Sequence, residues 1–405
     1  MSSPGAAFES PDFRFFVAAR FTAILAIEAV NVAVGWQVYA LTGRALDLGL
    51  VGLAQFLPIA GLTLVAGHVA DRFDRRMILL LCFLTYAACA VMLSRSADVR
   101  FIYLVLVLIG AVRAFSGPAS QALMPHLVPP EHLGNAVAWG SSAYKVANVA
   151  GPAVGGLAYA LVGPRGVYLG AAALFVAACA LMSAVRIRLG RMEHAALSWK
   201  TVLAGVEYVW RHKLVLGSIS LDLFAVLLGG AEALLPIFAR DLLHVGPWGL
   251  GLLRSASAIG AAITAITLAY RPIKERLGHV LFVSVAIFGL ATIAFGVSRN
   301  FIVTMFALSI VGASDMVSVY IRMTLVPLVT PPEMRGRVSA VNLIFIGASN
   351  ELGEFESGVT AQWLGAVRAA VAGGVGTLVV VGAWLGLFPA LRNFDRFQDG
   401  TAESD

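Results

Sequence analysis

The chain has 405 residues, of which 59% are hydrophobic and only 13% are charged, and its mean hydropathy is +0.85. Soluble domains typically carry about 25% charged residues, so this composition excludes an ordinary soluble protein. The net charge of +6 comes from Lys and Arg residues spread between apolar runs, which argues against a nucleic-acid partner.

Apolar runs of about twenty residues, long enough to cross roughly 30 Å of hydrocarbon as a helix, recur along the sequence. They predict an all-α polytopic membrane protein with twelve transmembrane helices in two six-helix halves. The first six are expected near Phe15–Leu41, Leu48–Ala70, Met77–Ser94, Phe101–Leu123, Ala136–Val162 and Val167–Val185. The second six are expected near Val215–Phe238, Pro247–Ala269, Val280–Val297, Phe301–Val329, Val338–Leu364 and Ala370–Leu387.

The charge distribution between these runs predicts the orientation of the chain. Alternate connections are rich in Lys and Arg, and the positive-inside rule places those connections and both termini in the cytoplasm. We expect no cleaved signal peptide. The expected order is a cytoplasmic tail over 1–13, a six-helix bundle over 14–186, a cytoplasmic linker over 187–213, a second bundle over 214–391 and a cytoplasmic tail over 392–405.

The linker contains apolar residues at helical spacing, opposite Lys200 and Glu207. They are Trp199, Val202, Leu203, Val206 and Val209. This pattern predicts an amphipathic helix on the cytoplasmic membrane surface, and a simple tether between the halves is the plainer interpretation.

The two halves share a sequence register. The segment from Pro125 to Glu131, with Gly134 after it, reappears from Pro327 to Glu333 with Gly336. The same offset aligns Gly110 with Gly312, Asn148 with Asn350, Gly151 with Gly353 and Gly156 with Gly358. Parallel repeats of six helices are a transporter architecture in which the substrate site lies near the midplane between the halves.

The connection between the second and third runs carries a Gly, an Asp-Arg pair and then two basic residues. They are Gly67, Asp71, Arg72, Arg75 and Arg76. This pattern resembles the loop signature of the major facilitator superfamily. The resemblance implies a cytoplasmic gate that holds the two halves together in one state and releases them in another. A loop that only sets topology is the alternative.

Two further motifs resemble that superfamily. Gly151, Pro152, Gly155 and Gly156 in the fifth run resemble the Gly-Pro signature of its exporters and antiporters, although alanines replace the glycines that often precede it. A proline bend flanked by glycines suits a seam between moving helices, or close helix packing alone. Arg113 in the fourth run resembles a buried Arg of proton-coupled members, unless it reaches the interface.

The eleventh run carries three carboxylates, on Glu351, Glu354 and Glu356, which is unusual in an apolar helix. Together with the segment from Gly35 to Tyr39, it resembles the exporter branch that includes the bacterial enterobactin exporter. The resemblance spans essentially the whole chain. It implies a proton-driven exporter of siderophores or drug-like molecules in the bacterial inner membrane.

Carboxylates inside the apolar runs are the candidates for carrying a proton. They are Glu28, Asp222, Glu232, Asp315, Glu351 and Glu354. Glu28 ranks first because of its depth in the first run, and Glu354 follows because the repeat aligns it with Pro152. The repeat also aligns Asp315 with Arg113, which allows a pair across a cavity. For Asp222, a structural ion pair or hydrogen bond near a helix end is the alternative interpretation. Arg254 and Arg322 could neutralise several of these acids.

Aromatic residues in the apolar runs have two interpretations. They line an apolar substrate pocket, or they face lipid and pack between helices. They are Phe56, Trp139, Tyr144, Phe224 and Phe345.

These patterns predict a secondary active transporter that works by alternating access, with proton-coupled efflux as the leading hypothesis. An uptake symporter of the same fold and a non-transporting receptor or assembly protein are the alternatives. An enzyme is not expected, since no catalytic triad, metal cluster or phosphate-binding loop is present in the sequence. We expect no cofactor or metal, and a monomer whose partners are a small molecule, protons and the bilayer. The identity of the substrate stays open.

Overall fold

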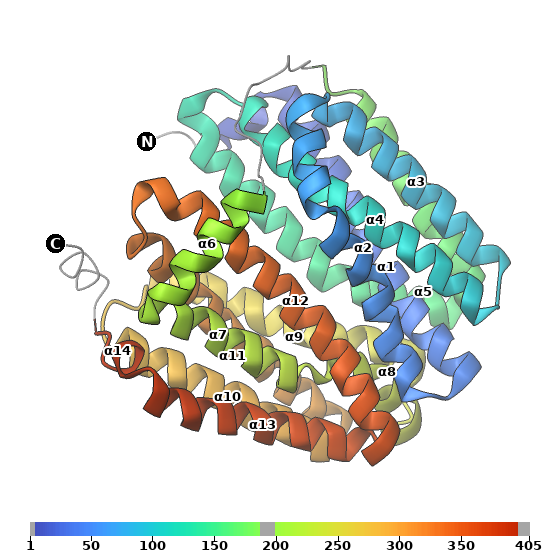
Figure 1. Cartoon of the computed structure of the whole chain (residues 1–405). Helices are drawn as coiled ribbons and strands as arrows, with labels where there is room; N and C mark the ends of the chain where they lie inside the picture. The colour runs from blue at the N-terminus through green and yellow to red at the C-terminus, as the bar shows by residue number, and fades with distance from the viewer. Residues whose placement is uncertain (1–4, 187–198, 396–405) are drawn as a thin grey trace. The chain divides into compact units, whose positions relative to one another are not determined.

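The computed structural model describes residues 5–186 and 199–395. These residues are almost entirely helical (Figure 1). The longer helices are α1 (Pro11–Thr42), α2 (Ala45–Arg72), α3 (Arg75–Arg95), α4 (Val99–Leu123), α5 (Leu133–Ser183), α6 (Trp199–Arg211), α7 (Lys213–Gly229), α9 (Gly246–Tyr270), α10 (Leu277–Val297), α11 (Phe301–Leu328), α12 (Pro332–Leu364) and α13 (Ala366–Leu387). The short elements are η1 (Ala6–Glu9), η2 (Met124–His126), η3 (Pro130–His132), η4 (Ala231–Leu234), α8 (Leu235–Ile237), η5 (Phe238–Leu242) and α14 (Pro389–Arg392).

Ten helical stretches within the described residues are long and apolar enough to cross a membrane. One of them contains α5, whose 51 residues include two of the predicted spans. α12 is not among the ten, and the three carboxylates in its middle lower its apolar character. Counting α5 twice and adding α12 gives the predicted six plus six helices.

One predicted helix boundary is confirmed and another is wrong. Gly163 adopts a φ of +68° and interrupts the helical geometry of α5, so the fifth span ends at Val162, as predicted, and the sixth span follows across a kink. The predicted helix Val215–Phe238 ends early, at Gly229, and is followed by a 3₁₀ turn, one α turn and a π-helical turn. Pro236 cannot donate a backbone hydrogen bond, which disfavours a regular helix there. Glu232 therefore lies in the 3₁₀ turn η4, still within the helical stretch Lys213–Leu242 that is apolar enough to cross a membrane.

The chain forms two compact units. Unit 1 comprises Met1–Gly43, Ala54–Leu197 and Gly246–Ser255, and unit 2 comprises Arg44–Leu53, Ser198–Val245 and Ala256–Asp405. The start of α2, within 44–53, therefore belongs to unit 2, whereas the rest of α2 belongs to unit 1. The start of α9, 246–255, belongs to unit 1, whereas the rest of α9 belongs to unit 2. They correspond under the sequence repeat, because Arg44 and Gly246 are 202 positions apart, as are Pro125 and Pro327.

Close helix contacts inside the two units also follow the repeat. In unit 1, a Cβ added to Gly110 of α4 would lie 2.2 Å from the backbone oxygen of Gln55 in α2. In unit 2, a Cβ added to Gly312 of α11 would lie 1.9 Å from the backbone oxygen of Ser257 in α9. Both residues of the second pair are 202 positions from those of the first. Each unit thus uses glycine to bring two membrane helices into backbone contact.

The predicted amphipathic linker helix is present as α6 in unit 2, where it lies against α12 (Figure 1). A Cβ on Gly205 would approach the backbone oxygen of Arg337 to 2.7 Å, and the Tyr208 hydroxyl donates a hydrogen bond of 3.2 Å to the oxygen of Val329. Leu203, Val206 and Trp210 leave their apolar side chains exposed. The first part of the predicted linker, residues 187–198, lies outside the described residues.

A methyl group at Gly312 tests the importance of this close packing. We expect Gly312→Ala to destabilise unit 2 by about 1–3 kcal/mol, since the added carbon overlaps backbone that cannot move aside easily. Gly382→Ala in α13 is the matched control, because nothing lies within 4 Å of its added Cβ. Thermal unfolding of the purified protein in detergent measures both changes, and equal melting temperatures for the two variants would contradict the expectation.

Candidate functional site

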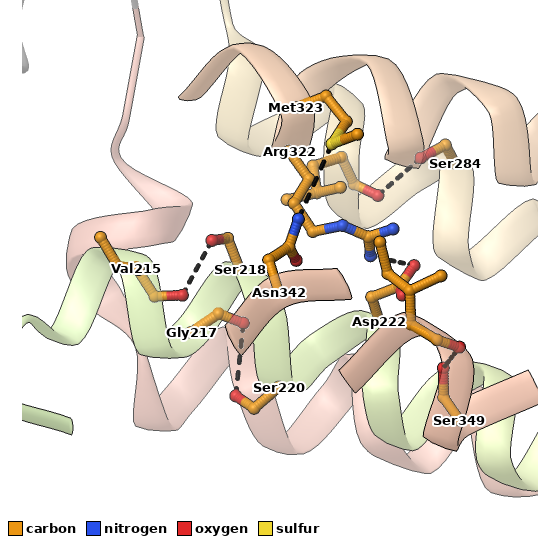
Figure 2. Close-up of polar contacts among 12 residues, drawn as sticks. Val215, Gly217, Ser218, Ser220, Asp222, Ser284, Arg322, Met323, Asn342 and Ser349 are labelled. Carbon is orange, nitrogen blue, oxygen red and sulfur yellow. Dashed lines mark hydrogen bonds and ion pairs between the residues drawn. The ribbon is translucent and has the colours of Figure 1, made fainter. Parts of the chain in front are cut away.

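The centre of unit 2 contains a buried ion pair. Asp222 of α7 and Arg322 of α11 join through a carboxylate oxygen and a guanidinium nitrogen (Figure 2). Asp222 is 6% exposed and Arg322 is 1% exposed, so both charges are almost completely shielded from bulk water. Charges in hydrocarbon are tolerated when they are paired in this way. Arg322 therefore neutralises the carboxylate of Asp222, one of the acids that it was predicted to neutralise.

The polar groups around this pair are incompletely satisfied. Within the described residues, Arg322 Nε and the Oδ1 atom of Asn342 have no hydrogen-bond partner, although both atoms are buried. Asn342 of α12 instead directs Nδ2 toward the Met323 sulfur at 3.7 Å, a weak interaction (Figure 2). Buried polar atoms without partners are uncommon in proteins, and they often mark ordered water or a functional rearrangement.

Asp315 lies beside the ion pair. A small cavity, about large enough for one water molecule, lies between them. It is lined by Asp222 of α7 and by Ser314, Asp315 and Ser318 of α11. The Ser314 hydroxyl is occupied, because it donates to the backbone oxygen of Ile310 at 2.7 Å. Asp315 has no hydrogen bond or ion pair within the described residues, and the charged group that it interacts with is another acid, Glu232.

The carboxylates of α12 lie against α2. A Cβ on Gly52 would approach Glu354 Oε2 to 2.8 Å and Glu351 Oε2 to 3.4 Å, so both side chains pack over this glycine within unit 2. Glu356 points elsewhere and accepts a hydrogen bond of 2.6 Å from Thr360 of its own helix. This agrees with the expectation that Glu351 and Glu354 share a face that Glu356 does not.

In unit 1, Glu28 lies against the Gly-Pro segment of α5. A Cβ on Gly151 would come within 2.5 Å of Glu28 Cβ, and a Cβ on Gly155 would come within 2.5 Å of Ala29 Cα. These two glycines therefore allow α1 to pack directly on α5. The neighbouring Gly156 packs against Gly251 of α9 in the same unit. The Gly-Pro segment thus combines a proline with close packing on two helices, as its sequence suggests.

The predicted gate motif forms the short connection between α2 and α3. Asp74 caps α3 by accepting a hydrogen bond of 2.9 Å from the Arg76 backbone. Arg76 donates to the backbone oxygens of Met182 at 3.3 Å and Ser183 at 2.6 Å, which ties the connection to the end of α5. Arg75 is buried and Arg72 is exposed, whereas Gly67 lies in the last turns of α2 and the Asp71 side chain lies outside the described part. A role in gating stays a prediction.

Arg113 is an exposed residue of α4, near Tyr86 of α3 and Ser116, whose two hydroxyl groups lie 3.4 Å apart. Arg113 belongs to unit 1 and Asp315 to unit 2, so the proposed pair between them stays a prediction.

A groove between α1 and α5, which we call the α1–α5 groove, was not found from the sequence. It consists of a cavity of about 440 Å³ and an adjoining crevice too narrow for a water molecule, and the two share Val17, Phe21 and Ala143. Trp139 and Tyr144, predicted as candidate pocket residues, are part of its wall. Arg14 and Arg20 of α1 are its cationic residues, and the first apolar run contains Arg20. The criterion that selected Glu28, an ionisable residue inside a membrane helix, also applies to Arg20.

The family model described as transmembrane secretion effector matches residues 2–403. The enterobactin exporters EntS of Shigella dysenteriae serotype 1 (strain Sd197) and of Escherichia coli O1:K1 are each 28% identical over 404 residues, covering 98% of this chain and 96% of theirs.

Solved transporter structures are also similar. The nucleoside transporter NupG has a TM-score of 0.72 at 13% identity, with 95% of this chain and 99% of that chain covered. A bacterial homolog of the human lysosomal transporter Spinster, in an inward-facing and occupied conformation, has a TM-score of 0.73 at 15% identity, with 97% of each chain covered. At such identities the likeness shows the fold alone.

The buried ion pair makes a testable contribution to stability. We expect Arg322→Met to destabilise the protein by about 3–5 kcal/mol, because it leaves the Asp222 carboxylate buried without a counter-charge. The double variant Arg322→Met/Asp222→Asn removes both charges and is expected to recover most of that loss. Arg211→Met, which breaks the exposed pair with Glu207, is the control and should change little. Thermal unfolding in detergent that shows the same loss in the single and double variants would contradict this account.

Proposed function

Because the chain belongs to the transmembrane secretion effector family of the major facilitator superfamily, we propose that it exports a small organic molecule in exchange for protons. The chain is a multi-pass membrane transporter of the inner membrane, with the all-α major facilitator fold, and it is not an enzyme. Its substrate is a small molecule.

Export is the proposed direction of transport. The curated relatives are named for enterobactin export, and the match covers nearly the full length of both chains. A siderophore or a drug-like molecule is therefore the proposed substrate class. Uptake by symport in the same fold is the alternative, and the direction of substrate movement distinguishes the two.

Proton coupling is supported above all by the arrangement of Asp222, Arg322 and Asp315. One acid of unit 2 is neutralised by Arg322, whereas the other has no counter-charge within the described residues and has Glu232 as its charged neighbour. A carboxyl group without a counter-charge is less costly to bury when it carries a proton. We therefore propose Asp315 as a proton carrier, beside Glu28, which the sequence ranks first.

The proposed cycle requires that the buried charges change partners. Arg322 can shift toward Asp315 when that group loses its proton, since both lie on α11 and Asp222 and Asp315 line the same cavity. Protonation of Asp315 would favour the arrangement in which Arg322 pairs with Asp222, and loss of the proton would favour the one in which Arg322 pairs with Asp315. A transporter that alternates between two states needs such a shift in their relative free energy. Glu28 lies against Gly151 of α5, where protonation would act on the packing of α1 against α5.

Removing the proton-binding group tests the coupling. The purified protein is reconstituted in proteoliposomes, and efflux of a panel of siderophores and drug-like compounds is followed together with the internal pH. We expect Asp315→Asn to reduce proton movement that depends on substrate by about tenfold or more, because an amide cannot exchange a proton. Glu28→Gln is examined beside it, and Glu131→Gln, which changes an exposed carboxylate of η3, is the control.

Two results would contradict the proposal. Proton and substrate fluxes that are uncoupled for every transported compound in the unaltered protein would exclude antiport. Normal coupling in both Asp315→Asn and Glu28→Gln would place the proton carrier elsewhere. Substrate accumulation driven by an inward proton gradient, in the same direction as the protons, would show a symporter.

A further inference from the structure

The α1–α5 groove has the size and the lining of a ligand site. Its main cavity of about 440 Å³ lies within the range of roughly 300–1,000 Å³ that is common for small-molecule pockets. Aromatic rings come from three parts of unit 1, namely Phe8 of η1, Phe21 of α1, and Trp139 and Tyr144 of α5. Phe8 and Trp139 are in edge-to-face contact with ring centroids 5.1 Å apart. Such rings offer both faces and edges to a planar guest.

The N-terminal segment is held in place as part of this wall. The backbone N–H of Ala7 donates to Asn135 Oδ1 at 3.0 Å, and the Ser10 hydroxyl donates to the backbone oxygen of Leu127 at 2.7 Å. Arg14 Nε donates to the backbone oxygen of Phe8. These contacts fix Phe8 and Arg14 on the same side of the groove, so the wall is ordered before a ligand arrives.

The charge of the groove is positive. Arg14 lines the cavity of about 440 Å³, Arg20 lines the narrow crevice that adjoins it, and none of the described lining residues is acidic. The Arg20 guanidinium stands 5.6 Å from the centroid of the Phe16 ring, and no carboxylate in the described part of the chain forms an ion pair with it.

An arginine inside a membrane helix is costly unless it meets water or an anion. Arg20 is nine residues from the start of α1, which corresponds to about 14 Å along the helix axis. The packing around Arg20 provides a π-face but no counter-ion, so a bound anion would supply what the protein itself lacks.

We propose that the α1–α5 groove binds aromatic anions, with Arg20 pairing with the negative group and the rings of Phe21, Trp139 and Tyr144 holding the aromatic body. This inference rests on the proposed function, since it names the chemical class of the exported molecule. The aromatic lining favours a ring compound over the headgroup of an anionic lipid, which would use the arginines alone. The positive charge disfavours the cationic compounds that many efflux systems carry.

Three naphthalene compounds that differ in charge test this proposal by calorimetric titration of the full chain in detergent. They are the anion 1-naphthoate, the neutral 1-naphthamide and the cation 1-naphthylmethylammonium. We expect naphthoate to bind at least about tenfold more tightly than either of the others, which is the size of effect that one charge-assisted contact produces. Saturating phosphatidylglycerol is expected to leave naphthoate binding in place.

Substitutions in the groove identify the residues responsible. Arg20→Gln should weaken naphthoate binding by about tenfold and leave naphthamide binding unchanged, whereas Arg20→Lys should keep most of the affinity. Ser142→Glu, at an exposed lining position of α5, should weaken naphthoate binding and strengthen binding of the cation, and it does not depend on how α1 tolerates substitution. Arg100→Gln at an exposed position of α4 is the matched control and should bind all three compounds as the unaltered protein does.

The proposal is overturned if naphthoate binds no better than the amide, if phosphatidylglycerol displaces it completely, or if Arg20→Gln and Ser142→Glu both bind it with unchanged affinity. These outcomes are separate from a failure of proton-coupled export. Export of other compounds with normal coupling would leave the proposed function intact without this groove, and charge-selective binding without coupled proton movement would leave the groove intact without antiport.

Discussion

Charged side chains in a hydrocarbon environment are the constraint on which this structure depends. In unit 2 the requirement is met by the ion pair of Asp222 and Arg322, which lies almost out of reach of water. In unit 1 it is met differently, because Arg20 contacts the ring of Phe16 and faces a groove. Unit 2 thus contains an acidic cluster with one paired arginine, whereas the α1–α5 groove of unit 1 is cationic and aromatic.

Backbone contact at glycine provides the rigid frame for these charges. The pairs Gly110 with Gln55 and Gly312 with Ser257 hold equivalent helices together, one pair in each unit. Asp315 follows Gly312 by three residues on α11, so it is carried on a helix whose position is set by that contact. A glycine contact next to a titratable group lets a small change of packing alter the surroundings of a charge, because packed helices shift between discrete arrangements and do not deform gradually.

Much of the fold could be predicted from the sequence, because hydropathy over twenty residues reports directly on the length that a membrane requires. The repeat was visible from prolines and glycines, which are restricted by backbone geometry. The break after Gly229 was missed because Ala231–Leu234 and Leu235–Ile237 are as apolar as a continuing helix, and only Gly230 and Pro236 indicate it.

The candidate site was predictable in its residue types but not in its pairings. Asp222, Asp315 and Arg322 were all identified as charged groups in apolar runs, yet the choice between partners depends on which helix faces meet. Arg20 was overlooked although it meets the same criterion. Phe8 could not have been found, since its place in the groove wall depends on hydrogen bonds between η1 and the start of α5 that no local pattern encodes.

The two proposals together have an energetic consequence that neither has alone. If a proton enters while a monovalent aromatic anion leaves, both movements carry positive charge inward, and one exchange transfers two elementary charges. An interior-negative potential supplies about 2.3 kcal/mol per charge for each 100 mV, so the potential drives such an exchange twice as strongly as it drives electroneutral cargo exchanged for one proton. The cationic groove lies on unit 1 and Asp315 on unit 2, which suits this exchange because an anion in the groove and a proton on Asp315 do not have to share one position. The positive charge that makes Arg20 costly to bury favours an anionic substrate, and the charge of that substrate makes its export responsive to voltage.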